Sequence, residues 1–404
     1  MPQPPIRARL GDLAGKPIAF MMALSFINYL GFAGWSALLY NFTIERAGFD
    51  WAEAGFTQSV REIPGFLAFT AIFWLLFMRE QVLAYAALFI LGIGVALTGQ
   101  FPTLTGVLIT TFVMSVGFHY FETANASLQL QLLPKGEAPR LMGIVTAAGA
   151  CASFVAYGGL AIAWWAGWRA FEELYLAVGL ACAALALAAM AFFRRFEGPV
   201  PQRKRLLLRK RYWLYYMLTF MTGARRQLFF AFGGFLLVKK FGYSVADMAM
   251  LMLVTTSLNS VLAPRLGALV MRAGERRTIM LENTVLILVF AGYATTSSWQ
   301  VAGLLFVIDG IFFTLTLAQR TYFQKIADPA DMASTMSAAF TINHIAAVIV
   351  PVAFGTLGMI NPSIIFWLGA CVATVSLSLS FLVPRHPAPG HETVLAEPRP
   401  QPAE

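Results

Sequence analysis

The sequence predicts an all-α membrane protein with twelve transmembrane helices in two six-helix bundles that repeat one another. Hydrophobic residues make up 58% of the 404 residues and charged residues only 12%, whereas soluble domains carry about 25% charged residues. The mean hydropathy is +0.69. The apolar residues form runs long enough to cross a bilayer, which requires roughly 20 residues in a helix. These observations exclude a soluble domain.

Each expected helix is an apolar run bounded by charged residues, prolines or glycines. The first bundle contains helices over about 17–42, 51–77, 81–100, 104–131, 141–165 and 172–193. The second contains helices over about 212–238, 244–271, 278–297, 299–324, 335–357 and 362–383.

Three polar segments flank these bundles, which cover residues 17–193 and 212–383. Residues 1–16 form a basic N-terminal segment, residues 194–211 a linker with eight lysines and arginines, and residues 384–404 a Pro- and Glu-bearing tail predicted to be disordered. Most of the 29 basic residues lie in these segments and in alternate loops, so we expect both termini in the cytoplasm and the chain in the plasma (cell inner) membrane. This distribution indicates a lipid bilayer partner and excludes nucleic acid.

The two halves have the pattern of an internal repeat. A shift of about 194 residues places Gly48 on Gly242, each directly before the second helix of its bundle. The same shift places Met142 on Met336, where the fifth helix of each bundle begins. Two parallel halves joined by a basic linker are typical of secondary transporters.

Two loops carry a family resemblance. Gly267, Leu269, Arg272 and Gly274 resemble the G-x-L-x-D-R-x-G-R-R loop of the major facilitator superfamily, with Met271 in place of the aspartate. The loop after the fourth helix carries Pro139-Arg140, similar to another loop of that family. Helix 5 lacks the Gly-Pro pair of the family's antiporters, so the direction of transport stays open. The resemblance implies a transporter with helices 1, 4, 7 and 10 around a central cavity. We expect no enzymatic activity, no cofactor, no bound metal and a monomer.

Arg225 and Arg226 lie in the middle of the seventh helix. Each guanidinium at the bilayer centre costs about 2.5–3.5 kcal/mol on insertion scales, so neither will face lipid. They either contact an anionic substrate or form buried ion pairs that lock neighbouring helices. Arg61-Glu62 in the second helix leaves the same choice, because Glu62 can pair with an arginine.

The fourth helix carries a polar stripe on one face. Its members recur at steps of three and four residues: Ser115, His119, Glu122, Asn125 and Gln129. His119 and Glu122 are three residues apart and can touch, so the pair can exchange a proton or serve as a packed hydrogen-bonded contact. On the tenth helix, Asp309 and Arg320 share a face, and the first helix contributes a milder stripe that includes Asn28 and Tyr29.

These patterns assign three roles. The expected substrate-binding residues are Arg61, Arg225, Arg226, Arg320, Tyr29, Asn28 and Asn125. The expected proton-coupling residues are Glu122, His119, Asp309 and Glu62. The expected gating residues are Arg265, Arg272, Arg276, Glu282 and Arg140, with Glu282 pairing with the basic loop after the eighth helix.

The sequence therefore predicts a secondary active transporter of a small organic anion or zwitterion that is coupled to protons. A second hypothesis in the same fold is an exporter of drugs or amphiphiles, which would bind by aromatic packing. A third is a polytopic membrane enzyme or scaffold, although the sequence offers no nucleophile or metal set at a membrane face. No G-x-x-x-x-G-K-[ST] motif is present, which argues against transport driven by ATP.

Overall fold

A computed structural model describes residues 13, 15–133, 137–196, 208–328 and 332–395. Regular structure in these residues is helical, apart from an isolated bridge between Ala388 and His391. Ten of the described helices are long and apolar enough to cross a membrane. The chain is an all-α membrane protein, as predicted.

The chain forms two compact units that exchange one short segment each. The first unit comprises Met1–Gly48, Val60–Gln202 and Tyr243–Thr256, and the second comprises Phe49–Ser59, Arg203–Gly242 and Ser257–Glu404. The units therefore differ from the predicted bundles by the first turns of two helices. These exchanged segments begin at residues 49 and 243, which is the same shift of 194 residues that relates Gly48 to Gly242. Both glycines have a positive φ, +66° and +70°, so a left-handed turn precedes each exchanged segment.

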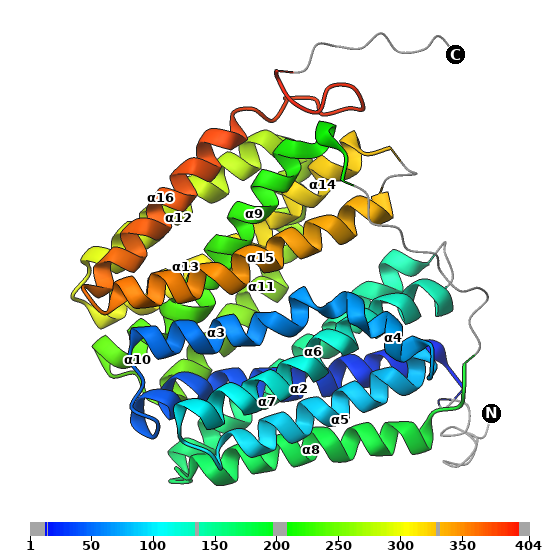
Figure 1. The fold of residues 1–404 in the computed structure, drawn as a ribbon, viewed down its shortest axis with the longest axis vertical. Coiled ribbons are helices and arrows are strands. Elements are labelled where there is room, and N and C mark those ends of the chain that lie inside the picture. Colours follow the sequence, from blue (N-terminus) through cyan, green and yellow to red (C-terminus); the bar gives the residue numbers. More distant parts are fainter. Residues whose placement is uncertain (1–12, 14, 134–136, 197–207, 329–331, 396–404) are drawn as a thin grey trace, which may run out of the picture. The chain divides into compact units, whose positions relative to one another are not determined.

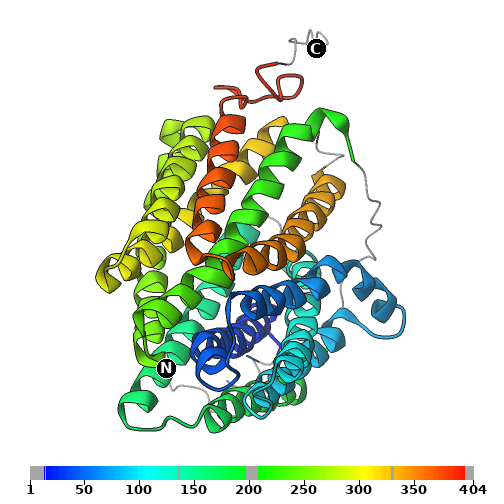
Figure 2. The ribbon, with the colours of Figure 1, turned by 60° about the vertical axis from the view of Figure 1, so that its left-hand side comes forward.

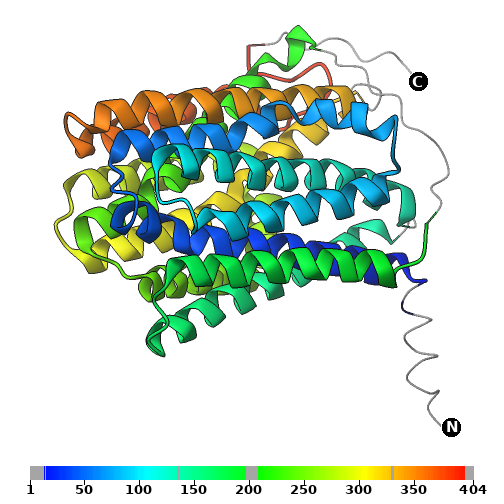
Figure 3. The same ribbon diagram turned by 60° about the horizontal axis from the view of Figure 1, so that its bottom comes forward.

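The first unit is built around α5, which packs against α6 and α8, while α2 packs against α7 and α8 (Figures 1 and 3). Its helices are α2 (Pro17–Glu45), α3 (Trp51–Phe66, from Val60 onward), η1 (Ala68–Thr70), α4 (Ala71–Leu75), α5 (Glu80–Thr98), α6 (Leu104–Leu132), α7 (Ala138–Trp165) and α8 (Phe171–Phe192). A Cβ at Gly94 would lie 2.4 Å from the Met114 nitrogen, and one at Gly179 would lie 2.2 Å from the Ala96 nitrogen. Glycine therefore allows the backbones of α5 and its two neighbours to approach closely.

The predicted second helix, 51–77, is shorter than expected. The helix α3 ends at Phe66, and η1 and α4 follow it. Pro64 lies in the last turn of α3, and proline disfavours a continuous helix because it lacks an amide hydrogen and its ring clashes with the preceding turn.

In the second unit, α12 packs against α16, and α9 packs against both α15 and α16 (Figure 2). The helices of this unit are η2 (Lys210–Tyr212), α9 (Trp213–Leu228), η3 (Phe229–Gly233), α10 (Gly234–Phe241), α11 (Val245–Ala273, from Ser257 onward), α12 (Glu275–Thr295), α13 (Trp299–Phe312), η4 (Phe313–Thr316), α14 (Leu317–Ile326), α15 (Met332–Gly358) and α16 (Pro362–Ser380).

Two of the predicted helices in this unit change their hydrogen-bond pattern near their charged residues. The π-helical turn η3 interrupts the predicted helix 212–238 directly after α9, whose last turn carries Arg225 and Arg226. The 3₁₀ turn η4 interrupts the predicted helix 299–324 four residues after Asp309. Such irregular turns within helices are frequent at functional sites.

The start of α3 is held in the second unit by polar and close backbone contacts. The Gln58 side-chain amide donates to the Gln227 side-chain oxygen over 2.6 Å, and Lys239 donates to the Phe49 carbonyl over 3.1 Å. A Cβ at Gly55 would lie 2.2 Å from the Pro351 carbonyl oxygen, so only glycine fits against α15 at this position.

Part of the tail that composition predicts to be disordered is packed. Val394 donates to the Leu382 carbonyl over 2.9 Å, and the Tyr322 hydroxyl donates to the Glu392 carbonyl over 2.5 Å. Glu392 and Thr393 are buried. Local hydrogen bonds and a buried tyrosine partner order residues 384–395 despite their polar composition, whereas residues 396–404 and most of the predicted linker (197–207) lie outside the described residues.

Candidate functional site

Arg61 and Glu62 in α3 form an ion pair inside the first unit, with both side chains buried. The Arg61 guanidinium also lies over the Phe32 ring, 5.7 Å from its centroid, and the Ser115 hydroxyl donates to the Arg61 carbonyl. Glu62 therefore neutralises Arg61 at its neighbouring position. Of the two alternatives that the sequence left open for Arg61, this geometry matches the buried ion pair.

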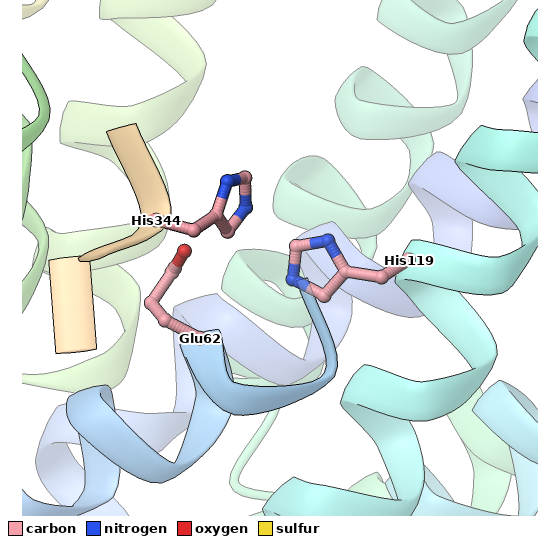
Figure 4. A group of neighbouring side chains, drawn as sticks. All are labelled: Glu62, His119 and His344. Atoms are coloured by element: carbon pink, nitrogen blue, oxygen red, sulfur yellow. The ribbon is translucent and has the colours of Figure 1, made fainter. Parts of the chain in front are cut away.

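His119 of α6 lies beside this pair. A ring nitrogen of His119 and a carboxylate oxygen of Glu62 lie within 4.8 Å of one another. Figure 4 shows His119 projecting from α6 toward the side on which Glu62 extends from α3; its third labelled residue, His344, belongs to α15 of the second unit. The structure thus places His119 near a carboxylate on another helix, in addition to Glu122 one turn away on α6.

Glu122 is the centre of a second polar group in the first unit. The Asn28 side-chain amide on α2 donates to a Glu122 carboxylate oxygen over 3.2 Å. The side-chain oxygens of Asn28 and Asn125 are buried and have no hydrogen-bond partner among the described residues. Tyr29, next to Asn28, is 38% exposed. The carboxylate and the two amide oxygens are all acceptors, so this group can bind the donors of a solute: an ammonium, a hydroxyl or a ring N–H.

Arg225 is the centre of a buried network in the second unit. Its Nη2 atom lies 2.8 Å from Oε1 of Glu282 on α12 and 3.1 Å from the Thr222 hydroxyl. Its Nη1 atom donates to the Asn283 side-chain oxygen over 3.3 Å. Arg225 is 3% exposed and Glu282 is fully buried. The Arg225 guanidinium is therefore already paired with a carboxylate of the protein.

This pairing corrects the role that the sequence suggested for Glu282. The predicted ninth helix starts at 278 and puts Glu282 near the basic loop that carries Arg272 and Arg276. The helix starts at Glu275 instead, so Glu282 lies about two turns inside α12 and faces α9. Glu275 forms the ion pair at this helix end, with its Oε1 atom 2.6 Å from Lys325 Nζ on α14.

The other predicted gating residues lie at the surface of the described structure. Arg140, Arg265 and Arg272 are exposed and Arg276 is half-buried. The Arg265 guanidinium donates to the Val261 carbonyl within its own helix over 3.4 Å. Their role in gating therefore remains a prediction.

Asp309 of α13 lies near the Arg225 network. It is 5% exposed and interacts electrostatically with both Arg225 and Glu282. Its Oδ2 atom and the Oε2 atom of Glu282 are buried without a hydrogen-bond partner in the described part of the chain. Three ionisable groups from three helices thus meet inside one unit, and two of them carry unsatisfied oxygens.

Two further arginines were expected to bind substrate. Arg320 of α14 is exposed and interacts electrostatically with Tyr215, while Arg226 is half-buried. Gln319, directly before Arg320, exchanges hydrogen bonds with Thr222 of α9 over 2.9 and 2.7 Å. Sequence reasoning missed Gln319 and Asn283, although each directly adjoins a charged residue that the sequence analysis had singled out, Arg320 and Glu282 respectively.

The comparisons with known proteins agree on the fold. The sequence matches the family described as the Major Facilitator Superfamily over residues 18–351, and no curated protein matches it. A mutant of the nucleoside transporter NupG has a similar structure, with a TM-score of 0.75, 15% identity, and coverage of 90% of this chain and 99% of that chain.

Two other solved structures are similar to this one. For a bacterial homolog of the human lysosomal transporter Spinster, inward-facing and occupied, the TM-score is 0.71 at 14% identity, covering 94% of this chain and 97% of that chain. For a POT family transporter in complex with 5-aminolevulinic acid, the TM-score is 0.71 at 13% identity, covering 90% and 94%. Identities this low establish the fold and leave the substrate to be argued from this chain's own residues.

Proposed function

We propose, from the premise that the chain belongs to the major facilitator superfamily, that it moves a small organic zwitterion or anion across the membrane by alternating access and is coupled to protons. Membership and fold make it a multi-pass membrane transporter rather than an enzyme. The substrate class and the coupling are the proposal. We place both termini in the cytoplasm and the protein, as a monomer, in the plasma (cell inner) membrane.

The acceptor group around Glu122 is the observation that carries the choice of substrate. Glu122, Asn28 and Asn125 offer four side-chain oxygens, two of which lack a hydrogen-bond partner among the described residues, whereas their donors are the two asparagine NH2 groups, one of which already donates to Glu122. A half-buried carboxylate beside unsatisfied amide oxygens favours a cationic or donor-bearing group on the solute. Tyr29, partly exposed, offers an aromatic face and a hydroxyl beside it. This supports a zwitterion over a simple anion.

The acidic group of the solute needs a cation. Arg61 and Arg225 are each neutralised by a carboxylate of the same unit. Within the second unit we therefore propose Arg320, which is exposed and has no carboxylate partner among the described residues, as a guanidinium for an acidic group. Arg226 of the same unit is the second guanidinium that we propose. Arginine suits the role because its planar guanidinium can grip a carboxylate with two parallel hydrogen bonds.

For proton coupling we propose the carboxyl groups that the sequence singled out. Glu122 lies on the substrate-binding stripe, with His119 one turn away. Glu62 and Asp309 are buried beside arginines in their own units. A carboxylate that binds the solute's ammonium in one protonation state and releases it in the other would link proton uptake to release of the solute.

A screen for thermal stabilisation of the purified protein tests this proposal. The panel contains amino acids and other zwitterions, the same carbon skeletons without the amino group, the same skeletons without the acidic group, and compounds that the structural neighbours carry or bind. We expect the zwitterions to stabilise the wild type, Glu122→Gln to abolish the advantage of the amino group, and Arg320→Gln to abolish that of the acidic group. Stabilisation by many amphiphiles, unchanged in both variants, would instead indicate an exporter of drugs or amphiphiles.

Transport itself is tested by counterflow. Proteoliposomes loaded with an unlabelled compound from the screen should accumulate the labelled compound transiently without any ion gradient. Labelled compound that leaves the vesicles chemically unaltered separates transport from catalysis. Absence of counterflow with every stabilising compound would overturn the assignment of substrate.

A further inference from the structure

Two carboxyl groups and one guanidinium lie together in the interior of the second unit. Glu282 is on α12, Asp309 on α13 and Arg225 on α9, and each side chain is at least nine-tenths buried. Their hydrogen bonds are incompletely satisfied. Arg225 donates to one oxygen of Glu282, whereas Oε2 of Glu282, Oδ2 of Asp309 and Nε of Arg225 have no partner among the residues that the structure describes.

The charges of this group do not balance if both carboxyls are ionised. Two carboxylates against one guanidinium leave one buried negative charge, and an uncompensated charge in a protein interior costs several kcal/mol. Binding of one proton by the carboxyl pair removes that charge. It also creates an O–H donor within a group whose oxygens now lack one.

The surrounding elements supply no second cation at this position. The elements α16, η3 and η4 contain no Asp, Glu, Lys or Arg. Lys240 donates to the Thr296 carbonyl at a helix end, and Lys325 pairs with Glu275. His344 on α15 has its Nδ1 atom 2.8 Å from the Phe340 carbonyl.

Arg276 and Arg277 lie in the first turn of α12, six and five residues before Glu282. The helices α9 and α14 carry two more arginines. Arg226 follows Arg225 on α9 and points about 100° away from it around the helix axis. Arg320 is exposed on α14. Arg225 is therefore the guanidinium that Glu282 and Asp309 share.

We propose that Glu282 and Asp309 bind one proton between them, with Arg225 neutralising the carboxylate that stays ionised. In this arrangement the proton forms one O–H bond on either carboxyl, and the other carboxylate pairs with the guanidinium. Glu282 thereby becomes part of a proton-binding site rather than a gate latch. The use of this proton in transport rests on the proposed function, whereas its binding does not.

The backbone around this site is irregular on two of the three helices. The helix α9 passes into the π-helical turn η3 three residues after Arg226, and α13 passes into η4 four residues after Asp309. Each break falls within about one turn of a charged member. Local rearrangement at these turns could change which carboxyl Arg225 contacts, and that change would decide which carboxyl holds the proton.

Infrared difference spectroscopy during a pH titration of the full-length protein tests the proposal without any substrate. The carboxylic-acid C=O band should contain a component from one buried protonated carboxyl of this pair, beside any contribution of Glu62 and Glu122, and this component disappears as the pH rises. We expect Glu282→Gln and Asp309→Asn each to remove this whole component from the difference between wild type and variant, because the remaining carboxylate then pairs with Arg225 and stays ionised. The control is Glu173→Gln, an exposed glutamate of α8 outside this network, which should leave the band unchanged.

The pattern across variants decides the outcome. If only one of the two substitutions removed the band, the proton would belong to a single residue, and the proposal that Glu282 and Asp309 share it would be wrong. Absence of a titrating band in the wild type would overturn the site altogether. Arg225→Gln should double the band if it folds, because both carboxyls must then be neutral. Failure of counterflow with the band intact would overturn the proposed substrate and leave this inference standing.

Discussion

Glu282→Leu should change the free energy of unfolding in opposite directions in the wild type and in the Arg225→Met variant. In the wild type, Glu282→Leu removes a buried partner of Arg225, although Asp309 remains to neutralise the guanidinium. We expect a loss of about 1–3 kcal/mol in the free energy of unfolding, the usual effect of losing a buried hydrogen bond to a charged group. In Arg225→Met, by contrast, the same substitution should increase stability.

The opposite signs arise because the Glu282 carboxyl is buried away from water. Arg225→Met alone leaves Glu282 buried without its cation, and breaking a buried ion pair from one side costs about 3–5 kcal/mol. Adding Glu282→Leu removes this buried carboxyl group, which without Arg225 must bind a proton, and replaces it with an apolar side chain of similar size. Asp309 then becomes neutral by binding a proton. We expect the double variant to recover about 1–3 kcal/mol relative to Arg225→Met.

Denaturant unfolding of the purified proteins in one detergent, followed by tryptophan fluorescence, measures these differences. Substitution of an exposed residue of the same helix, Leu281→Ala, controls for nonspecific effects of changes in α12. Equal destabilisation by Glu282→Leu in both backgrounds would refute the reasoning. Arg225→Ala is for the same reason a poor test of anion binding. It destabilises the fold, and an unfolded protein would show the same loss of substrate binding as a protein that lacks a binding residue.

Three further predictions follow from other contacts. Glu122→Gln should keep the fold but weaken binding of an amine-bearing solute at least about tenfold, since a charged hydrogen bond contributes about 1.5–3 kcal/mol; equal affinity in isothermal calorimetry would contradict this. Gly223→Ala should lower the thermal midpoint because its Cβ would lie 2.6 Å from a carbonyl of α15, whereas Gly267→Ala, with nothing within 4 Å, should not; equal midpoints would sink the packing argument. Tyr322→Phe should cost about 0.5–1.5 kcal/mol and expose the tail around Glu392 to protease; unchanged cleavage would show that this hydrogen bond does not hold the tail.

The positions of most helices could be predicted because hydropathy runs and their charged or Pro/Gly boundaries are local signals. The fourth helix, predicted at 104–131, is α6, Leu104–Leu132. The repeat was visible in Gly48 and Gly242 because a left-handed turn requires the same residue type in both halves. The breaks at η3 and η4 were not visible, since their residues are as apolar as an uninterrupted helix.

The partners of the charged residues could not be predicted from spacing. The spacing of polar residues fixes which of them share a helix face. It does not fix how that helix is rotated, or shifted along its axis, relative to the adjacent helix. An error of three residues at the start of α12 moves Glu282 by about 4.5 Å along the helix axis, enough to assign it to a basic loop instead of Arg225. For Arg61, the partner proved to be its own neighbour in sequence, Glu62.

Uptake into proteoliposomes under an imposed pH gradient is the most direct test of proton-coupled transport. The probe is the zwitterion that most stabilises the purified protein, with inward and outward gradients compared in the same vesicles. The account predicts accumulation above the external concentration with one gradient direction, abolished by a protonophore and by Glu122→Gln. Uptake that only reaches the external concentration, whatever the gradient, would contradict it.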